Sequence, residues 1–281
     1  MLSLLKIKGI LDQLSASERK LADFILDNSH LLRDYSSQQL ADAVGISQSS
    51  VVKFCQKLGY KGYPDLKLAI TEAIVTATTL QREQQDSGNE EGSLAQLAEH
   101  LQQSLLQSLR NLLSINTEKT LHQAIQLLDK ADKVLLAGSS HSAVVATDMQ
   151  CRLLALGKMA LYHSDPAISL QLARTLTTQS VLLLISDCGQ NTDILRLEQY
   201  ARQRKLKVIS LTRFQTNAQS AAADITLFTL GSEADAQLQQ LITQQAQQHL
   251  CHLLYLGLCQ HPANRHHLTE HAPLMALLEK N

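Results

Sequence analysis

The chain has 281 residues, of which 44% are hydrophobic and 18% are charged, and its formal net charge is −1 at pH 7. This length indicates about two domains of ~150 residues, and the nearly balanced charge excludes a protein that binds nucleic acid through overall basicity. The N-terminal stretch lacks the form of a signal peptide, and no apolar run is long enough to span a bilayer. We therefore expect a cytoplasmic protein without a membrane partner.

The cysteines form neither a metal motif nor a disulfide framework. Five of them are scattered along the chain without a Cys-x-x-Cys spacing, which is typical of reduced thiols in the cytoplasm. No histidine and cysteine spacing indicates zinc. We predict no cofactor and no bound metal.

The first 35 residues predict three helical segments. Apolar residues recur at helical intervals over 2–14 and 18–28, and a shorter segment covers 30–35. Ser15 followed by Glu18 has the spacing of a capping box, in which each side chain accepts a hydrogen bond from the other residue's amide. We expect a small all-α domain at this end of the chain.

The stretch from Ser37 to Leu58 has the pattern of a helix-turn-helix. Two short apolar faces flank Gly45, which can adopt a positive φ and connect two helices within a few residues. Ser47 suits the N-cap of the second helix. Short polar side chains at the start of such a helix reach base edges in a major groove, and lysines contact phosphates. The predicted DNA-binding residues are Ser37, Ser47, Gln48, Ser49, Ser50, Lys53, Lys57 and Lys61.

Each of these features also has a simpler interpretation. Four lysines against Asp65 give residues 47–70 a net charge of +3, which supports phosphate contacts but also fits a solvated face. Tyr60 and Tyr63 either touch the DNA backbone or pack in the helical core. The helix pair itself could be an ordinary hairpin with a polar outer face.

Residues 81–93 have no apolar periodicity and contain glycine, serine and acidic residues, which is typical of an exposed linker. We place a helix-turn-helix domain at 1–78, a linker at 79–93 and a second domain at 94–281. The second domain begins with helical patterns over 94–113 and 118–130.

From Lys133 onwards, short apolar strands alternate with helices. Uniformly apolar strands indicate a parallel sheet covered on both faces. The expected fold is an α/β domain with a five-stranded, flavodoxin-like parallel sheet and helices on both faces. The predicted strands are 133–138, 159–163, 181–186, 207–212 and 224–229, and the predicted helices are 142–156, 166–176, 194–204, a weak one around 218, and 234–259.

Two hydroxyl-rich loops follow the first and third predicted strands, at 138–142 (GSSHS) and 186–193 (SDCGQNTD). Ligands of such sheets bind beyond the carboxyl ends of the strands, where the strand order reverses. A helix N-terminus favours an anion there. Without a P-loop lysine the two loops suit a small phosphate ester, although their serines also fit plain helix capping. The predicted ligand-binding residues are Ser139, Ser140, Ser142, Ser186, Cys188, Gly189, Asn191 and Thr192, with Glu233 before the last helix.

These motifs resemble those of the RpiR/MurR family of bacterial transcription regulators, and the similarity covers nearly the whole chain. Residues 45–70, GISQSSVVKFCQKLGYKGYPDLKLAI, are close to the family's DNA-binding signature. The two loops are similar to the phosphate loops of its sugar isomerase (SIS) domain, G-x-G-x-S and S-x-S-G-x-T-x-E. The positions carried over by this resemblance are Ser142, Ser186, Gly189 and Asp193.

The loops also depart from that pattern. Ser140 replaces the second glycine, Cys188 replaces a serine, and Asn191 stands where threonine is usual. Asp187 brings a carboxylate beside the proposed anion site, where it would oppose a phosphate if it pointed inward. An altered effector and a site that has lost its ligand both fit these departures.

The resemblance implies a DNA-binding regulator whose SIS domain senses a phosphorylated sugar. Its partners would be double-stranded DNA, the sugar effector and further copies of the chain, as a homodimer or homotetramer. The alternative is a sugar-phosphate isomerase with an accessory helical domain, for which His141, Glu233 or His163 would be the base, although no motif marks any of them. A pure interaction module would leave the two serine loops without a role. We predict a regulator that has no catalytic residue.

Overall fold

The computed structural model describes residues 2–11, 14–71, 93–215, 217–230 and 236–267. The chain divides into two compact units, Met1–Glu99 and His100–Asn281. Nearly all of the linker predicted at 79–93 lies outside the described residues, and so does Glu233. The domain boundaries at 78 and 94 therefore stay predictions.

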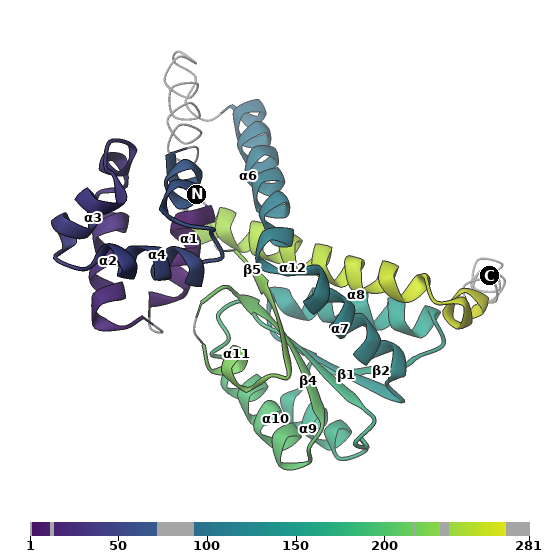
Figure 1. Cartoon of the computed structure of the whole chain (residues 1–281). Coiled ribbons are helices and arrows are strands. Elements are labelled where there is room, and N and C mark those ends of the chain that lie inside the picture. The colour runs from purple at the N-terminus through teal and green to yellow at the C-terminus, as the bar shows by residue number, and fades with distance from the viewer. Residues whose placement is uncertain (1, 12–13, 72–92, 216, 231–235, 268–281) are drawn as a thin grey trace. The chain divides into compact units, whose positions relative to one another are not determined.

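The described part of the first unit is built from helices. Its elements are α1 (Leu2–Gly9), α2 (Ala16–Asp27), the 3₁₀ helix η2 (Ser29–Arg33), α3 (Ser37–Val44), α4 (Gln48–Lys57) and a helical stretch over 63–71 (Figure 1). The predicted capping box is confirmed at the start of α2. The Ser15 amide donates to Oε2 of Glu18 at 2.8 Å, and the Glu18 amide donates to Oγ of Ser15 at 3.4 Å.

Gly45 allows the tight turn between α3 and α4. Its φ of 71° and ψ of 41° lie in the left-handed region, which glycine enters without a Cβ clash. The amide of Ile46 donates to the carbonyl of Ala41 at 2.9 Å and closes the end of α3. Ser47 then begins α4 as its N-cap, with Oγ accepting from the Ser50 amide at 3.2 Å. The predicted helix-turn-helix is confirmed.

One apolar core holds these helices together. Its fully buried side chains include Leu21, Ile25, Leu40, Ala41, Val51 and Phe54. Tyr63 is also buried, and its hydroxyl donates to the carbonyl of Tyr35 at 3.0 Å. Tyr60 is half-buried and donates to Oγ of Ser3 at 2.8 Å. Both tyrosines therefore pack in the core, as the simpler interpretation of the sequence expects.

The second unit is an α/β domain. Its strands are β1 (Lys133–Gly138), β2 (Met159–Tyr162), β3 (Val181–Ile185), β4 (Lys207–Arg213) and β5 (Ile225–Thr229). Its helices are α6 (Leu94–Ile115), α7 (Glu118–Lys130), α8 (His141–Ala155), α9 (Pro166–Ala173), α10 (Thr192–Gln203), α11 (Ala218–Ala222) and α12 (Ala236–Cys259), of which α6 begins before the unit does. None of the described helices is both long and apolar enough to cross a bilayer.

The strand order is β2-β1-β3-β4-β5, and every neighbouring pair is parallel. The five-stranded flavodoxin-like sheet predicted from the sequence is therefore confirmed. The order reverses between β1 and β3, which lie side by side with Gly138 opposite Ile185. The loops that follow these two strands consequently leave the sheet at the same edge.

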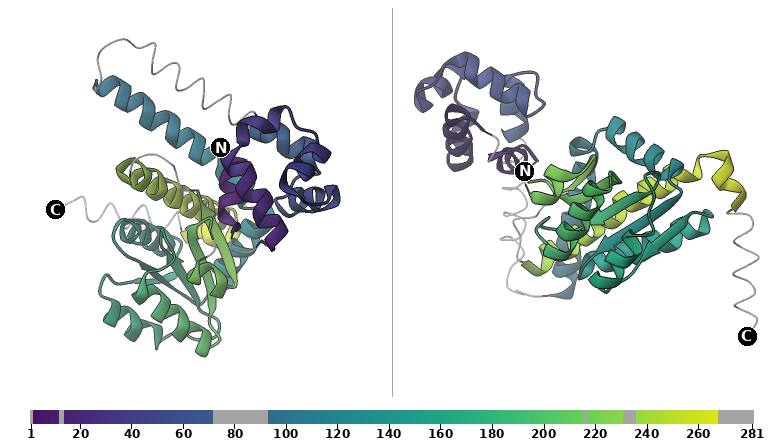
Figure 2. Two further views of the ribbon diagram at one scale, coloured as in Figure 1. Left: turned by 90° about the vertical axis from the view of Figure 1, so that its left-hand side faces the viewer. Right: turned by 90° about the horizontal axis from the view of Figure 1, so that it is seen from below.

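The central strands β1 and β3 are almost wholly apolar because helices cover both faces of the sheet. Along β3, Val181, Leu183 and Ile185 belong to one core with side chains of α7, α8 and α12. Leu182 and Leu184 belong to a second core with side chains of α9 and α10. This alternation follows from the two-residue period of a strand, and Figures 1 and 2 show the two helical layers on opposite faces.

Candidate functional sites

The two hydroxyl-rich loops meet at the carboxyl edge of the sheet. Nδ2 of Asn191, at the start of α10, donates to Oγ of Ser139, after β1, at 3.1 Å. The N-termini of α8 and α10 therefore open onto the same edge, where the strand order reverses. Parallel α/β sheets bind ligands at such an edge, and helix N-termini offer free amides and a positive dipole end.

The first loop leads directly into α8. Ser142 lies in the first turn of this helix with 6% of its surface exposed, and its hydroxyl donates to Oε1 of Gln247 in α12 at 3.1 Å. Ser139 and Ser140 are exposed. Ser140 has a φ of 54° and a ψ of −127°, a backbone conformation that normally belongs to glycine.

The second loop is closed by its own polar groups. The buried Ser186 accepts the amide of Gly189 on Oγ at 3.2 Å. Gly189 has a φ of 65°, and a Cβ there would collide with the side chain of Asn217. Asn191 caps α10 by accepting the amides at 193 and 194, each at 3.1 Å. Cys188 and Thr192 are exposed at the same edge.

Asp187 does not place an uncompensated charge beside these loops. Its Oδ2 lies 2.6 Å from Nη2 of Arg213, and its Oδ1 accepts from Nε of Arg213 at 3.1 Å. Such a two-point contact with a guanidinium holds the carboxylate in place and neutralises it. The repulsion of phosphate that the sequence suggested for Asp187 is therefore offset at the end of β4.

The structure adds residues from α12 that the sequence analysis missed. Gln247 bonds Ser142, and Nε2 of Gln240 lies at hydrogen-bond distance from Nδ1 of His141. Thr243 is on the same helix and is 3% exposed. The available signal was the presence of Thr243 and Gln247 among apolar residues on the buried side of α12, where a core-facing helix is normally apolar.

Five of the predicted DNA-binding residues lie at the N-cap and first turns of α4, namely Ser47, Gln48, Ser49, Ser50 and Lys53. Gln48, Ser49 and Lys53 are exposed, and Ser50 is half-buried. Oγ of Ser47 lies 2.9 Å from Oγ of Ser49 and 2.8 Å from Oγ of Ser50. These side chains are therefore accessible at a helix start, as a helix that reads a major groove requires.

Two other side chains tie α4 to its neighbours. Nε2 of Gln48 donates to Oγ of Ser37 in α3 at 2.7 Å. Nζ of Lys57 lies 3.0 Å from Oε2 of Glu18, whose pKa is held below its ordinary value mainly by the amide of Ser15. Lys61 is exposed beyond the end of α4. A phosphate would have to compete with Glu18 for Lys57, whereas the described residues give Lys53 no ion pair.

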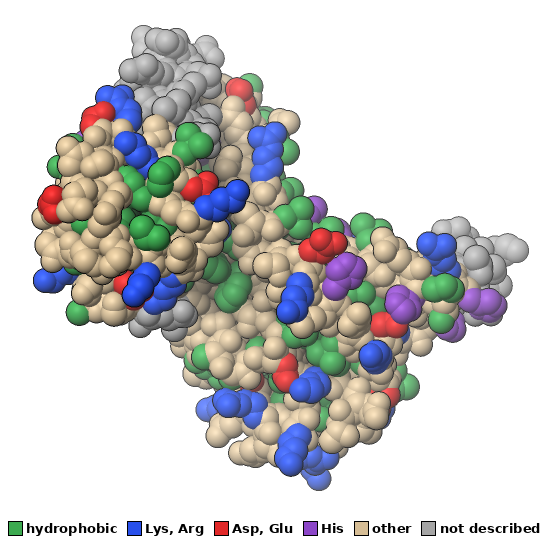
Figure 3. Space-filling model, in the orientation of Figure 1, with side chains coloured by type: hydrophobic (Ala, Val, Ile, Leu, Met, Phe, Trp, Pro, Cys, Tyr) green, Lys and Arg blue, Asp and Glu red, His purple; other side chains and the backbone are tan. Residues whose placement is uncertain are grey.

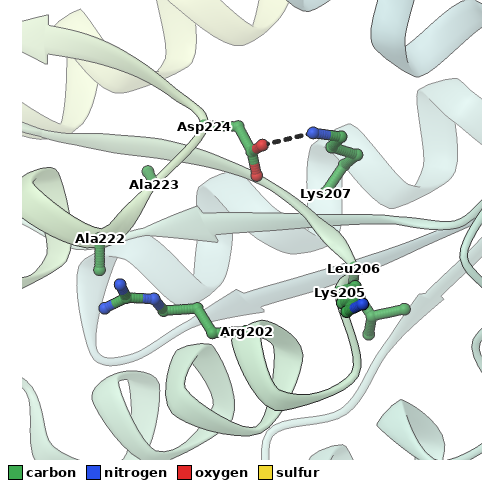
Figure 4. A pocket seen from close by; sticks show the side chains of 7 residues that line it. All are labelled: Arg202, Lys205, Leu206, Lys207, Ala222, Ala223 and Asp224. Carbon is green, nitrogen blue, oxygen red and sulfur yellow. Dashed lines mark hydrogen bonds and ion pairs between the residues drawn. The ribbon is translucent and has the colours of Figure 1, made fainter.

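At the opposite edge of the sheet, the described residues form no convergent anion site. Figure 3 shows Lys and Arg side chains over the part of the second unit that carries α9 and α10. A pocket of about 310 Å³ there is lined by Arg202, Lys205 and Lys207, but Figure 4 shows these cations pointing in different directions. Lys207 lies 2.6 Å from Asp224. Within the described residues, no cluster of His, Cys, Asp or Glu is arranged to hold a metal ion.

Comparison with known proteins gives matches to both parts of the chain. The profile of the helix-turn-helix domain of the rpiR family matches residues 1–77, and that of the SIS domain matches residues 127–256. The chain is 32% identical over 260 residues to the uncharacterized HTH-type transcriptional regulator YfhH of Escherichia coli (strain K12), covering 92% of each chain.

Two solved structures share the fold. The Vibrio vulnificus NanR protein complexed with ManNAc-6P is 22% identical with a TM-score of 0.62, covering 99% of this chain and all of that one. The sugar isomerase domain of the RpiR transcription factor from Sphaerobacter thermophilus is 16% identical with a TM-score of 0.56, covering 64% of this chain and 98% of that one. At these identities the likeness shows the fold alone.

Proposed function

Because the chain belongs to the RpiR family of helix-turn-helix transcriptional regulators, we propose that it binds duplex DNA through α4 and that a phosphorylated sugar controls this binding. The observation that carries the proposal is the exposure of the first turn of α4, at Gln48 and Ser49, together with Lys53 one turn later. Side chains packed inside the unit could not reach a groove. Their exposure removes the simplest objection to DNA binding.

The start of α4 would enter the major groove. Gln48 can pair with an adenine edge, and the hydroxyls of Ser49 and Ser50 can turn toward either base partner or phosphate. Lys53 would contact a phosphate. One helix-turn-helix makes a small contact, so two copies of the chain would bind two half-sites about one helical turn apart.

The phosphate of the effector would lie between the N-termini of α8 and α10. The Ser139–Asn191 contact brings the two loops together, and the exposed Ser140 and Thr192 supply further hydroxyls. An anion is favoured by the positive ends of the two helix dipoles there, without a lysine. The ManNAc-6P bound to the fold relative NanR supports a phosphorylated sugar as the class of ligand.

Control of DNA binding requires that the sugar prefers one arrangement of the oligomer. A ligand shifts an equilibrium only by its difference in affinity for the two states. The sugar would therefore favour an arrangement in which the two α4 helices either fit or miss the half-site spacing.

The test is the affinity for a random duplex at 50 and 200 mM salt, followed by a thermal-shift screen of phosphorylated sugars. Six phosphate contacts would weaken binding about 10³-fold between these salt concentrations. A bound sugar raises the apparent stability, and Ser186→Ala should remove that rise, whereas Thr178→Ala, on the opposite edge, should not. No DNA binding at low salt would contradict the proposal, and full stabilisation of Ser186→Ala would move the ligand elsewhere.

A sugar-phosphate isomerase is the second candidate, because the SIS profile matches and the exposed His141 lies at the ligand edge. Proton transfer between neighbouring carbons needs a base at the substrate. Nδ1 of His163 accepts the Asp165 amide at 3.0 Å and so stabilises a turn. Interconversion of aldose and ketose phosphates, followed by NMR, would establish the enzyme; its absence over a broad panel would favour the regulator.

A further inference from the structure

We infer that α12 forms a second wall of the ligand site, at which Ser142 changes partner when the ligand binds. The hydroxyl of Ser142 turns from Gln247 to the phosphate, and Gln247, together with Thr243, then bonds an uncharged oxygen of the sugar. This inference rests on the proposed function, because it assigns the second half of the same site.

Two hydrogen bonds place this face of α12 against the first loop. Gln240 contacts His141 at the exposed rim, and Gln247 accepts the hydroxyl of Ser142 at the buried end. Thr243 lies between these two glutamines, three residues after the first and four before the second. Residues at such intervals share one face of a helix, so Thr243 faces the start of α8 as well.

Two polar side-chain atoms on this face of α12 are buried and lack a hydrogen-bond partner among the described residues. Thr243 is 3% exposed and Gln247 is 1% exposed. Among the described residues, neither Oγ1 of Thr243 nor Nε2 of Gln247 has a hydrogen-bond partner. Buried polar atoms are normally paired, and each exception calls for a partner that the protein chain does not supply. Two such atoms beside a helix N-terminus indicate that a ligand completes the set.

Ser142 has to serve two partners in turn. It lies in the first turn of α8, where an anion would be held, yet its hydroxyl donates to Oε1 of Gln247. A hydroxyl has one proton to donate. When a phosphate oxygen accepts the hydrogen bond from Ser142, the carboxamide oxygen of Gln247 loses its donor. Both the oxygen and the nitrogen of this carboxamide can then bond the sugar.

The chemistry of this wall selects the sugar part of the ligand. A carboxamide nitrogen donates, its oxygen accepts, and a threonine hydroxyl does both, so the wall suits hydroxyl, carbonyl or acetamido oxygens. The two charged pairs described at this edge, Asp187 with Arg213 and Asp193 with Arg196, each combine one positive and one negative group. The favoured class is thus a sugar phosphate whose only charge is the phosphate, and a second carboxylate on the sugar would remain unpaired.

The experiment compares inorganic phosphate with a panel of ligands on the full chain by calorimetry. The panel contains N-acetylmannosamine 6-phosphate, glucose 6-phosphate and 6-phosphogluconate. The two test variants are Gln247→Met and Thr243→Val, and the control is Gln245→Met, whose exposed side chain lies elsewhere on α12. Thr243→Val removes a buried unpaired hydroxyl, so this variant should fold at least as stably as the parent chain.

Both test variants should bind the preferred neutral sugar phosphate about 3- to 10-fold more weakly, the effect of one lost hydrogen bond. Inorganic phosphate should bind Thr243→Val unchanged and Gln247→Met as tightly or more tightly, because Ser142 is freed. Three results would overturn this inference but not the proposed function. The first is that the parent chain prefers 6-phosphogluconate. The others are that the test variants leave the ratio of sugar phosphate affinity to phosphate affinity unchanged, or that they weaken both ligands equally. Failure of the parent chain to bind phosphate or any sugar phosphate would overturn the proposed sensing function with it.

Discussion

Ser140 shows how one residue can keep the geometry of a loop whose sequence has changed. The family pattern has glycine at this position, and the serine retains a backbone conformation typical of glycine, with φ at 54° and ψ at −127°. A side chain in this region strains the backbone. Oγ of Ser140 lies 3.0 Å from Nδ1 of His141, a contact that offsets part of this strain.

Ser140→Gly should therefore raise the free energy of unfolding by about 1 kcal/mol, because relief of the strain exceeds the added freedom of the unfolded chain. Urea denaturation measures the difference. Ser139→Gly is the matched control: its φ is not positive, so its free energy of unfolding should fall by about 0.5–1 kcal/mol from the added freedom of the unfolded chain, and further through loss of the hydrogen bond from Asn191. Destabilisation by both variants would show that the contact with His141 outweighs the strain.

Glu198 gives the second unit a pH-dependent stability. It is 2% exposed in α10, its Oε1 has no partner among the described residues, and burial raises its pKa from 4.5 to about 7. Between these pH values the folded chain holds a proton that the unfolded chain has released. The contribution of Glu198 to stability is therefore most favourable at low pH, falls as the pH rises toward 7, and stays reduced above it.

Glu198→Gln should raise the free energy of unfolding by about 1–3 kcal/mol at pH 8 and change it little at pH 5. Urea denaturation at both pH values tests this difference. Glu118→Gln is the control: this exposed carboxylate at the start of α7 pairs with the exposed His122, so its dependence on pH should be small, about 0.5 kcal/mol or less, and without the gain at pH 8. An equal gain at both pH values would mean that packing, rather than titration, sets the effect.

At the scale of elements, the sequence predicts the strands and turns that depend on residues close together in the chain. The central strands β1 and β3 were predictable because they are buried on both faces, and the turn at Gly45 because a left-handed residue there favours glycine. The contacts of Asp187 with Arg213 and of Ser142 with Gln247 were not predictable, since they depend on which residues the folded chain brings together over long sequence separations. The loops of the site followed from their motifs, whereas the α12 wall did not.

Helix α4 carries two lysines, Lys53 and Lys57, with different surroundings. Lys53→Ala should weaken binding to all duplexes and reduce the slope of log affinity against log salt by about 1 per half-site. Lys57→Ala should change the slope less, because Glu18 already neutralises that ammonium group. Gln48→Ala, as a control, should alter the ranking of operator variants. Fluorescence anisotropy over a salt series measures both quantities, and equal slopes for all three variants would contradict the role of Lys53.

For the whole molecule, sensing is a coupling between two binding events. If the sugar changes operator affinity by some factor, the operator must change sugar affinity by the same factor. The magnitude of such couplings is typically about 5- to 150-fold. The direction decides whether the sugar releases the protein from DNA or holds it there.

This reciprocity can be measured on the full chain. Anisotropy gives the operator affinity with and without saturating sugar phosphate, and calorimetry gives the sugar affinity with and without saturating operator duplex. The two factors should agree, because both report the same shift between arrangements of the oligomer. Ser186→Ala should bind the operator with an affinity that the sugar no longer changes. A sugar that binds tightly but leaves operator affinity unchanged in the parent chain would show that the two units do not communicate, and the sensing proposal would fail.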